Sequence, residues 1–374
     1  MFFDCDICGD RLPAKTICLT YDDGPGATAG DGPGPQTREI GRYLFEQQIA
    51  AAFFVVGSHA VEHLELVKQL SSWGHVVGNH TYTHSGMVGL AQEGGDVVQE
   101  VLRTEEVLRS CAEAPVRFFR APYGSWREVH RTPAGDAMRS PVAERLNEAP
   151  ELAHYVGHIH WDICTCDYDF WNAGAPAEAC AEFCLGEILR LQRGIVLLHD
   201  SSEDSCQRGR NRTREVTERI VPFLKSHGFR FVRIDEIPQV RSAMRTRSLV
   251  TLELGDGRSL CSLPGDAVGF RIRPHVPAEP GSAPGGPAER WGLIPLSDDT
   301  FALRAANGCY LSSDGGSLAE VRADGTEIGQ PQTFRFEIAP DGKAFLQTLA
   351  GECLAPSLVA NSRWLSSFAV GNTG

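Results

Sequence analysis

Two pairs of side chains that commonly bind metal ions lie in the first part of the sequence. His80 and His84 are four residues apart, a spacing that places both imidazoles on one face of a helical turn, where they can share an ion. Asp22 and Asp23 form the second pair. Histidines at this spacing occur by chance in many chains, so the interpretation depends on the residues around them.

Polar residues follow apolar runs at five points of the chain. They are Asp22 with Asp23, His80 with His84, Arg120, Asp167 and His199. The carboxyl ends of parallel strands meet at one face of a barrel, and barrel enzymes place their catalytic residues there. We therefore expect these side chains to lie together.

The elements that must position them alternate between strand and helix. Seven short apolar runs predict strands at Lys15–Thr20, Ala51–Val56, Val76–Gly78, Val116–Phe119, Gly157–Asp162, Ile195–Leu198 and Phe231–Ile234. Helical periodicity is present at Thr37–Gln47, His59–Trp73, Asp96–Cys111, Ala175–Leu191 and Arg214–His227. This alternation predicts parallel βαβ units, and seven units indicate an α/β barrel. No G-x-G-x-x-G follows a strand, which argues against a nucleotide-binding sheet.

The metal-binding residues would form an open, catalytic type of site. Asp23, His80 and His84 supply one carboxylate and two imidazoles, which leave positions for water and substrate. Zinc is the default ion, although cobalt, nickel, manganese or iron also accept these ligands. Asp22 would lie beside the bound water and take its proton as general base. Arg120 would orient the Asp22 carboxylate through a charge-assisted hydrogen bond, unless it forms only a peripheral salt bridge.

A proton donor is also needed, and His199 is suitably placed for that role. It closes a buried strand, so its alternative role is that of a hydrogen-bonded core histidine. As general acid it would protonate a leaving amine or alkoxide. Asp167 would hold its ring and raise its pKa, and Asp162 and Asp169 are alternatives for that position.

Two other classes of protein would explain fewer of these residues. A sugar-binding protein that has lost its activity has no use for the general base Asp22, nor for Arg120 and His199. A non-haem iron oxygenase would use two histidines and one carboxylate, but it leaves His199 and the paired aspartates unexplained.

Five motifs, in order along the chain, resemble those of the polysaccharide deacetylase family (NodB-homology domain, carbohydrate esterase family 4). They are Thr20–Pro25, His80–His84, Arg120–Tyr123, Trp161–Tyr168 and Leu197–Asp200. The resemblance covers residues 14–237 and implies a distorted (β/α)7 barrel that removes acetyl groups from N-acetylated glycans or from O-acetylated xylan. It implies the roles given above, and it adds the backbone N–H of Tyr123 as an oxyanion donor and Leu197 as part of an acetyl pocket.

Departures from the family pattern concern the substrate rather than the metal. Tyr168 stands where the family usually has Trp, and Cys164 where it often has Asp. The stretches 26–35 and 124–156 are longer than usual, and we expect them to narrow a groove over the site. The alternative to a long glycan is therefore a small acetylated amino sugar. Another alternative is a non-sugar amide or other non-peptide C–N bond, hydrolysed by the same residues.

Composition limits the partners and the compartment. The 374 residues carry a net charge of −13, which argues against nucleic-acid and anionic-membrane partners. The N-terminus shows no export signal, so we expect a cytoplasmic protein as the chain stands, or an extracellular one if a signal has been removed. The twelve cysteines lack the paired spacing of a structural zinc site, and free thiols are the default.

The pattern changes after Val240, and we place the domain boundary between residues 243 and 244. The segments 252–260, 301–311 and 345–354 are alike, and each precedes an aromatic-led strand, at Trp291–Ile294, Phe334–Ile338 and Phe368–Val370. A threefold repeat of about 40 residues predicts a β-trefoil with a disordered insertion at Pro274–Pro287. Residues 244–374 resemble fascin-like trefoils, which implies a carbohydrate or protein ligand. The alternative is a structural domain that packs on the barrel and shapes its mouth.

Overall fold

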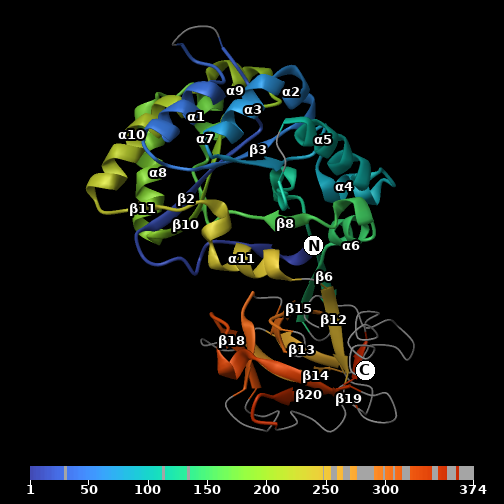
Figure 1. The fold of residues 1–374 in the computed structure, drawn as a ribbon. Helices are drawn as coiled ribbons and strands as arrows, with labels where there is room; N and C mark the ends of the chain where they lie inside the picture. Colours follow the sequence, from blue (N-terminus) through green and yellow to red (C-terminus); the bar gives the residue numbers. More distant parts are fainter. Residues whose placement is uncertain are drawn as a thin grey trace.

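The computed structural model describes residues 1–28, 32–111, 114–132, 135–246, 248–253, 259–263, 270–275, 290–297, 300–305, 308–313, 321–338, 344–351 and 359–361. The chain forms an α/β domain, residues 1–246, followed by a β-rich part (Figure 1). Within the described residues, no helix combines the length and apolarity that crossing a bilayer requires.

Parallel strands form the centre of the α/β domain, as predicted. The seven expected runs become β2 (Thr16–Asp22), β3 (Ala52–Val55), β4 (Val76–Asn79), β5 (Arg117–Phe118), β8 (Tyr155–Ile159) with β9 (Ile163–Cys164), β10 (Arg193–His199) and β11 (Arg230–Phe231). One sheet has the order β4-β3-β2-β10-β9, with β11 on β2, and β5 pairs with β8. A bridge from Asn79 to Phe119 links β4 to β5, and all these pairings are parallel.

The closely spaced strands β8 and β9 connect the two ends of this arrangement. β8 pairs with β5, and β9, a few residues later, pairs with β10. A strand that the sequence did not reveal, β1 (Phe2–Ile7), pairs with the free side of β8. The strands therefore curve around a shared apolar core that includes Phe54, Phe118, Ile159 and Ile195.

Helices cover the outside of the strands. They include α1 (Thr37–Glu46), α4 (Met87–Gln92), α5 (Val97–Cys111), α7 (Asp167–Ala173), α8 (Ala177–Leu191), α9 (Ser205–Arg210), α10 (Thr213–Ser226) and α11 (Pro238–Arg245), with short 3-10 turns at Pro122–Gly124, Pro150–Leu152 and Ile234–Glu236. The single helix predicted over His59–Trp73 is wrong. The segment is two helices, α2 (Gly57–Glu62) and α3 (Leu64–Ser72), because the backbone of His63 leaves the helical region, with φ −131°.

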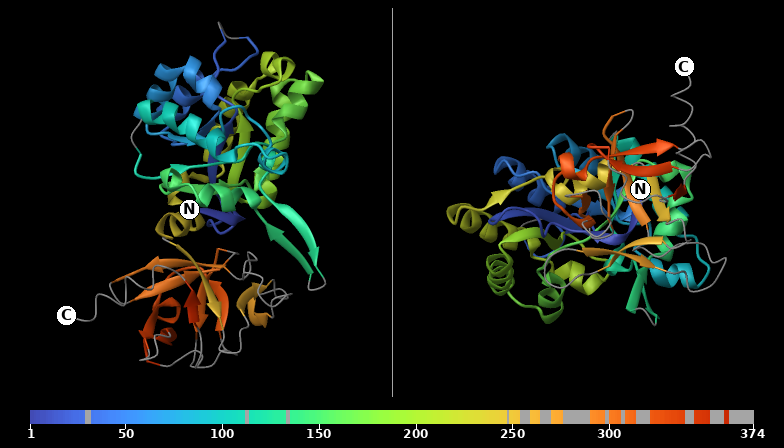
Figure 2. Two further views of the ribbon diagram at one scale, coloured as in Figure 1. Left: turned by 90° about the vertical axis from the view of Figure 1, so that its right-hand side faces the viewer. Right: turned by 90° about the horizontal axis from the view of Figure 1, so that it is seen from below.

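The long stretch 124–156 does not narrow the site as expected. It contains the hairpin β6 (Glu128–Thr132) and β7 (Gly135–Arg139) and the helix α6 (Pro141–Asn147). The hairpin projects toward the β-rich part, away from α2 and α9 (Figures 1 and 2). The stretch 26–35 lies at the end of the α/β domain near α2 and α9, and residues 29–31 of it lie outside the described residues.

The β-rich part is antiparallel throughout its described strands. These are β12 (Ser248–Glu253), β13 (Ser259–Leu263), β14 (Phe270–His275), β15 (Arg290–Pro295), β16 (Phe301–Arg304), β17 (Tyr310–Ser313), β18 (Val321–Gly325), β19 (Phe334–Ile338), β20 (Ala344–Thr348) and β21 (Val359–Asn361). The order is β15-β12-β13-β14-β18-β17-β16-β19-β20, and β15 also pairs with β16, which closes a ring. The predicted strand Phe368–Val370 and most of the predicted insertion Pro274–Pro287 lie outside the described residues.

The β-rich part lies at the α11 end of the α/β domain, opposite α2 and α9 (Figure 1). Arg304 is buried there, with its guanidinium 4.5 Å from the centre of the Phe3 ring. This part therefore packs on the α/β domain, as the structural alternative expects, but it does not shape the mouth of the barrel, since the five sequence motifs lie at the other end.

Candidate active site

The predicted metal ligands converge on one point at the carboxyl end of the strands. Asp23 Oδ1 lies 2.9 Å from His84 Nε2 and 3.5 Å from His80 Nε2. All three side chains are buried, and one potential ligand atom from each lies within 4.8 Å of the others. The prediction that these three side chains lie together is therefore confirmed.

The predicted helical turn that would carry the two histidines is wrong. The segment 80–84 is an irregular loop after β4, and both Thr81 and His84 have positive φ, at 67° and 59°. The rings nevertheless face each other, with centroids 5.1 Å apart. Convergence therefore comes from the shape of the loop and not from helical periodicity.

Two side chains from outside the motif hold this loop. Glu100, on α5, accepts hydrogen bonds through Oε2 from the backbone N–H of Tyr82 (3.1 Å) and of Thr83 (2.8 Å). Asn79 accepts from the N–H of Thr81 at 2.9 Å. Buried backbone donors need such partners. Glu100 was not among the predicted site residues, and its only sequence signal is its place as a charged residue on an apolar helix face.

The contacts of Asp23 and His80 suit a bound divalent cation. Asp23 Oδ1 is buried without a hydrogen-bond donor of suitable geometry, and its position between two imidazole nitrogens suits a shared cation. The Nδ1 of His80 lies 2.8 Å from the carbonyl oxygen of Arg120. A carbonyl can only accept, so Nδ1 carries the proton and Nε2 offers its lone pair to an ion.

Arg120 and Asp22 form a fully buried pair beside these ligands. Arg120 Nη1 donates to Asp22 Oδ1 at 2.7 Å and to the Thr20 hydroxyl at 2.8 Å. The guanidinium also lies 4.2 Å from the centre of the Phe54 ring. This fixed position excludes the alternative of a peripheral salt bridge and aims the second oxygen, Asp22 Oδ2, to within 3.7 Å of His80 Nε2.

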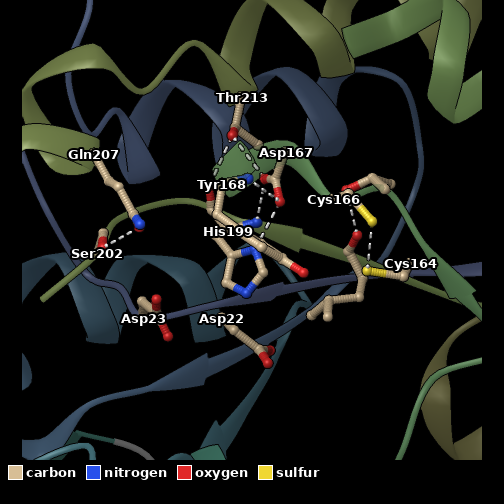
Figure 3. A network of polar contacts seen from close by, with 12 residues as sticks. Asp22, Asp23, Cys164, Cys166, Asp167, Tyr168, His199, Ser202, Gln207 and Thr213 are labelled. Atoms are coloured by element: carbon tan, nitrogen blue, oxygen red, sulfur yellow. Dashed lines mark hydrogen bonds and ion pairs between the residues drawn. The ribbon is translucent and has the colours of Figure 1, made fainter. Parts of the chain in front are cut away.

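His199 lies beside Asp22 and Asp23, with its Nε2 toward them (Figure 3). Asp167 lies on the opposite side of the His199 ring. Asp167 Oδ1 lies 2.7 Å from His199 Nδ1, so His199 Nδ1–H donates to this carboxylate. Burial lowers the pKa of His199, but the charge and hydrogen bond of Asp167 outweigh it and raise the pKa to about 10. Of the three carboxylates considered, Asp167 is therefore the partner. Asp162 instead accepts the backbone N–H groups of Gly9 and Ile195, both at 2.7 Å.

Asp200, the last residue of the fifth motif, is a buried carboxyl group that was not among the predicted site residues. The Thr37 hydroxyl donates to it, and burial raises the pKa of Asp200 to about 7. It packs against Gly24, where an added Cβ would lie 2.2 Å from Asp200 Oδ2. Any larger residue at position 24 would therefore force the buried Asp200 carboxyl group to move.

The two residues proposed to contact the acyl group lie beside these side chains. Tyr123 has φ 58° and is 72% exposed, and its ring centroid is 4.7 Å from that of His84. Leu197 is buried on β10, two residues before His199.

The described cysteines form no disulfide. All ten whose side chains are described are free thiols, in agreement with the default expectation. Cys164 and Cys166 lie close to the site (Figure 3), with their sulfurs 3.4 Å apart.

Comparison with known proteins agrees with the motifs. Residues 9–138 match the family model described as polysaccharide deacetylase. A chitooligosaccharide deacetylase of Sinorhizobium fredii is 29% identical over 224 residues, which are 58% of this chain and 88% of that protein. A peptidoglycan-N-acetylglucosamine deacetylase of Bacillus cereus is 27% identical over 223 residues, 60% of this chain and 68% of that protein.

Solved structures cover the same region. A crystal structure of a peptidoglycan N-acetylglucosamine deacetylase is 24% identical and covers 63% of this chain and 92% of that chain, with a TM-score of 0.47. The family match over residues 9–138, the relatives and the five motifs at one end of the strands agree that the α/β part of this chain is similar to polysaccharide deacetylases.

Proposed function

We propose that the α/β domain is a metal-dependent hydrolase that removes acetyl groups, most directly N-acetyl groups, from a carbohydrate. One observation carries the proposal: the metal-ligand cluster has a buried Asp22–Arg120 pair beside it and the His199–Asp167 pair across from it. The named relatives, which are chitooligosaccharide and peptidoglycan deacetylases, support a sugar substrate over a non-sugar amide.

The first step requires a proton acceptor. Asp22 is the general base that takes a proton from the attacking water, and Arg120 keeps its carboxylate in place through the 2.7 Å hydrogen bond. Asp23, His80 and His84 would hold the divalent ion, for which we propose zinc. When bound, the ion supplies Lewis-acid polarisation of the acyl oxygen and of the water.

The second step requires a proton donor. His199 holds a proton at its Nε2 and delivers it to the departing nitrogen, while Asp167 orients the ring through Nδ1. The backbone N–H of Tyr123 is proposed to donate to the oxyanion, and Leu197 to contact the acetyl methyl group.

The exposed ring of Tyr123 bears on the size of the substrate. At 72% exposure beside His84, it offers a flat surface at the mouth of the site, and sugar rings pack on such surfaces. The hairpin β6–β7 projects away from this face. Both features support an oligosaccharide substrate over a small amino sugar.

We also propose that residues 244–374 form a β-trefoil that binds a carbohydrate or a protein. The antiparallel ring of strands, and the aromatic residues Trp291 and Phe334 at the starts of β15 and β19, support this proposal.

Acetate release tests the enzymatic function. The purified protein, loaded with Zn²⁺, should release acetate from N-acetylated chitooligosaccharides or peptidoglycan fragments, and a chelator should abolish the release. Acetylated xylan and small acetamides in the same panel decide the substrate class. Release from the small acetamides alone would overturn the carbohydrate assignment.

A further inference from the structure

One peptide group joins the metal ligand His80 to a second, deeply buried histidine. The carbonyl oxygen of Arg120 accepts a hydrogen bond from His80 Nδ1 at 2.8 Å. The N–H of the same peptide group, that of Ala121, donates to His158 Nδ1 at 3.0 Å. Both directions are fixed, because a carbonyl only accepts and a backbone N–H only donates.

This contact determines the protonation state of His158. Its Nδ1 must offer a lone pair to Ala121, so the ring is neutral and its proton is on Nε2. That Nε2 lies 3.3 Å from His160 Nδ1, to which it donates. His158 is completely buried, and burial, with the charges of nearby groups including Arg120 and Arg127, holds its pKa well below the usual range. A neutral His158 ring therefore agrees with both its hydrogen bonds and the direction of its pKa.

The same contacts argue against a second metal site. Asp6, His158 and His160 each place a potential ligand atom within 4.8 Å of the others. However, one nitrogen of His158 accepts from Ala121 and the other carries a proton, which leaves no lone pair for a cation. Arg127 also donates to Asp6 Oδ2 at 2.5 Å, which places a positive charge where a cation would bind. His160 and His158 instead belong to a hydrogen-bonded chain that leads to His80.

We propose that His158 is a positioning residue for the metal centre and acts on His80 through the Arg120–Ala121 peptide. By accepting from the N–H of Ala121, His158 holds the peptide in the plane in which its carbonyl meets His80. The same hydrogen bond polarises that carbonyl, because linked hydrogen bonds strengthen one another. Partners that orient a metal-binding histidine affect metal affinity by roughly 10–100-fold. The proposal rests on the proposed function only in that it needs a metal at Asp23, His80 and His84.

The test measures metal affinity without substrate. His158→Leu removes the acceptor, and we expect Zn²⁺ to bind roughly tenfold more weakly or worse in competition with a chromogenic chelator. His158→Asn restores an acceptor, since its Oδ1 takes the place of Nδ1, and should bind Zn²⁺ as the unmodified protein does. Equal affinity of His158→Leu and the unmodified protein would overturn the proposal. The loss of a second bound equivalent of Zn²⁺ in His158→Leu would also overturn the proposal, because it would mean that His158 itself binds a metal ion.

His75 provides a matched control elsewhere in the same domain. It is buried, its Nδ1 accepts from the N–H of Ala51 at 3.2 Å, and its Nε2 lies 2.8 Å from the carbonyl oxygen of Gly41. His75→Leu should cost stability while leaving the Zn²⁺ affinity unchanged. A similar loss of affinity in both leucine variants would mean that unfolding, and not the peptide link, is responsible, which would overturn the proposal.

A second measurement needs no variant and covers the case in which His158→Leu does not fold. In ¹⁵N-histidine NMR spectra of the Zn²⁺-loaded protein, His158 should show a protonated Nε2, an unprotonated Nδ1 and no titration between about pH 5 and pH 8. A titrating ring, or a proton on Nδ1, would contradict the proposal. These measurements do not involve turnover, so a protein that binds Zn²⁺ as described but releases no acetate would sink the proposed function alone.

Discussion

Asp167 contacts His199 through both of its carboxylate oxygens. Oδ1 lies 2.7 Å from His199 Nδ1, and Oδ2 accepts the backbone N–H of His199 at 2.7 Å. The Thr213 hydroxyl lies 3.3 Å from the same Oδ2. The carboxylate is therefore fixed relative to the ring and to the strand that carries it, which gives the His199 ring a single orientation.

Replacing this carboxylate should change the pH dependence of turnover. His199 must be protonated to act as an acid, and Asp167 raises its pKa against the effect of burial, to about 10. In Asp167→Asn the pKa falls, so the alkaline limb of the kcat profile should move to lower pH by roughly 1–3 units. Asp169→Asn, an exposed neighbour on α7, is the control and should keep the original limb. An unchanged limb in Asp167→Asn would remove His199 from the role of acid.

Asp22 should be needed for turnover but not for metal binding. Asparagine at this position can still accept from Arg120, so Asp22→Asn keeps the buried contact but loses the proton acceptor. We expect turnover to fall by roughly 10²–10⁴-fold while Zn²⁺ remains bound, as measured by acetate release and elemental analysis.

Variants of the predicted metal ligands provide the contrast to Asp22→Asn. Asp23→Ala and His84→Ala should lose both bound Zn²⁺ and turnover, since each removes one atom of the ligand cluster. Normal turnover in Asp22→Asn would show that another group takes the proton.

The sequence predicted which residues meet, but not how the backbone brings them together. Parallel strands that end in polar residues place Asp22, His199 and the others at one face, and this topology follows from periodicity alone. The loop that carries His80 and His84 depends on positive φ values and on Glu100, a residue on a helix that lies later in the chain. Such side-chain-to-backbone contacts leave no periodic signal.

Two other misses have similar physical causes. The break between α2 and α3 at His63 lies within a segment that has helical periodicity throughout, and no glycine or proline marks it. A position of the β-rich part near the mouth was one of two alternatives, because a sequence carries no docking geometry. The buried contact between Arg304 and Phe3 lies instead at the α11 end, and each of these residues appears ordinary in its own segment.

Glu100 should control the metal-binding loop from a distance. Its Oε2 accepts three hydrogen bonds, from the N–H groups of Tyr82 and Thr83 and from the Thr83 hydroxyl at 3.0 Å. Glu100→Ala leaves these donors without their acceptor, which should cost about 1–3 kcal/mol in the free energy of unfolding and weaken Zn²⁺ binding. Chemical denaturation and chelator competition measure the two effects. Glu106→Ala, an exposed residue on the same helix, should change neither, and a normal Zn²⁺ affinity in Glu100→Ala would show that the loop holds its shape alone.

The β-rich part should be dispensable for chemistry but not for stability. Its contacts with the α/β domain include ones at α11 and β1, at the end opposite the metal ligands. A chain that ends after Thr246 should therefore hydrolyse a small acetylated chitooligosaccharide with an unchanged kcat, and its Tm should be lower because Phe3 loses the cover of Arg304. In the full chain, Arg304→Ala should lower the Tm in the same direction and leave kcat unchanged. If the shortened chain is folded by circular dichroism, binds Zn²⁺ and yet has lost turnover of the small substrate, the β-rich part acts on catalysis across the whole α/β domain. If it loses activity only on polymeric substrates, the β-rich part supplies substrate binding, as the proposed carbohydrate-binding trefoil requires.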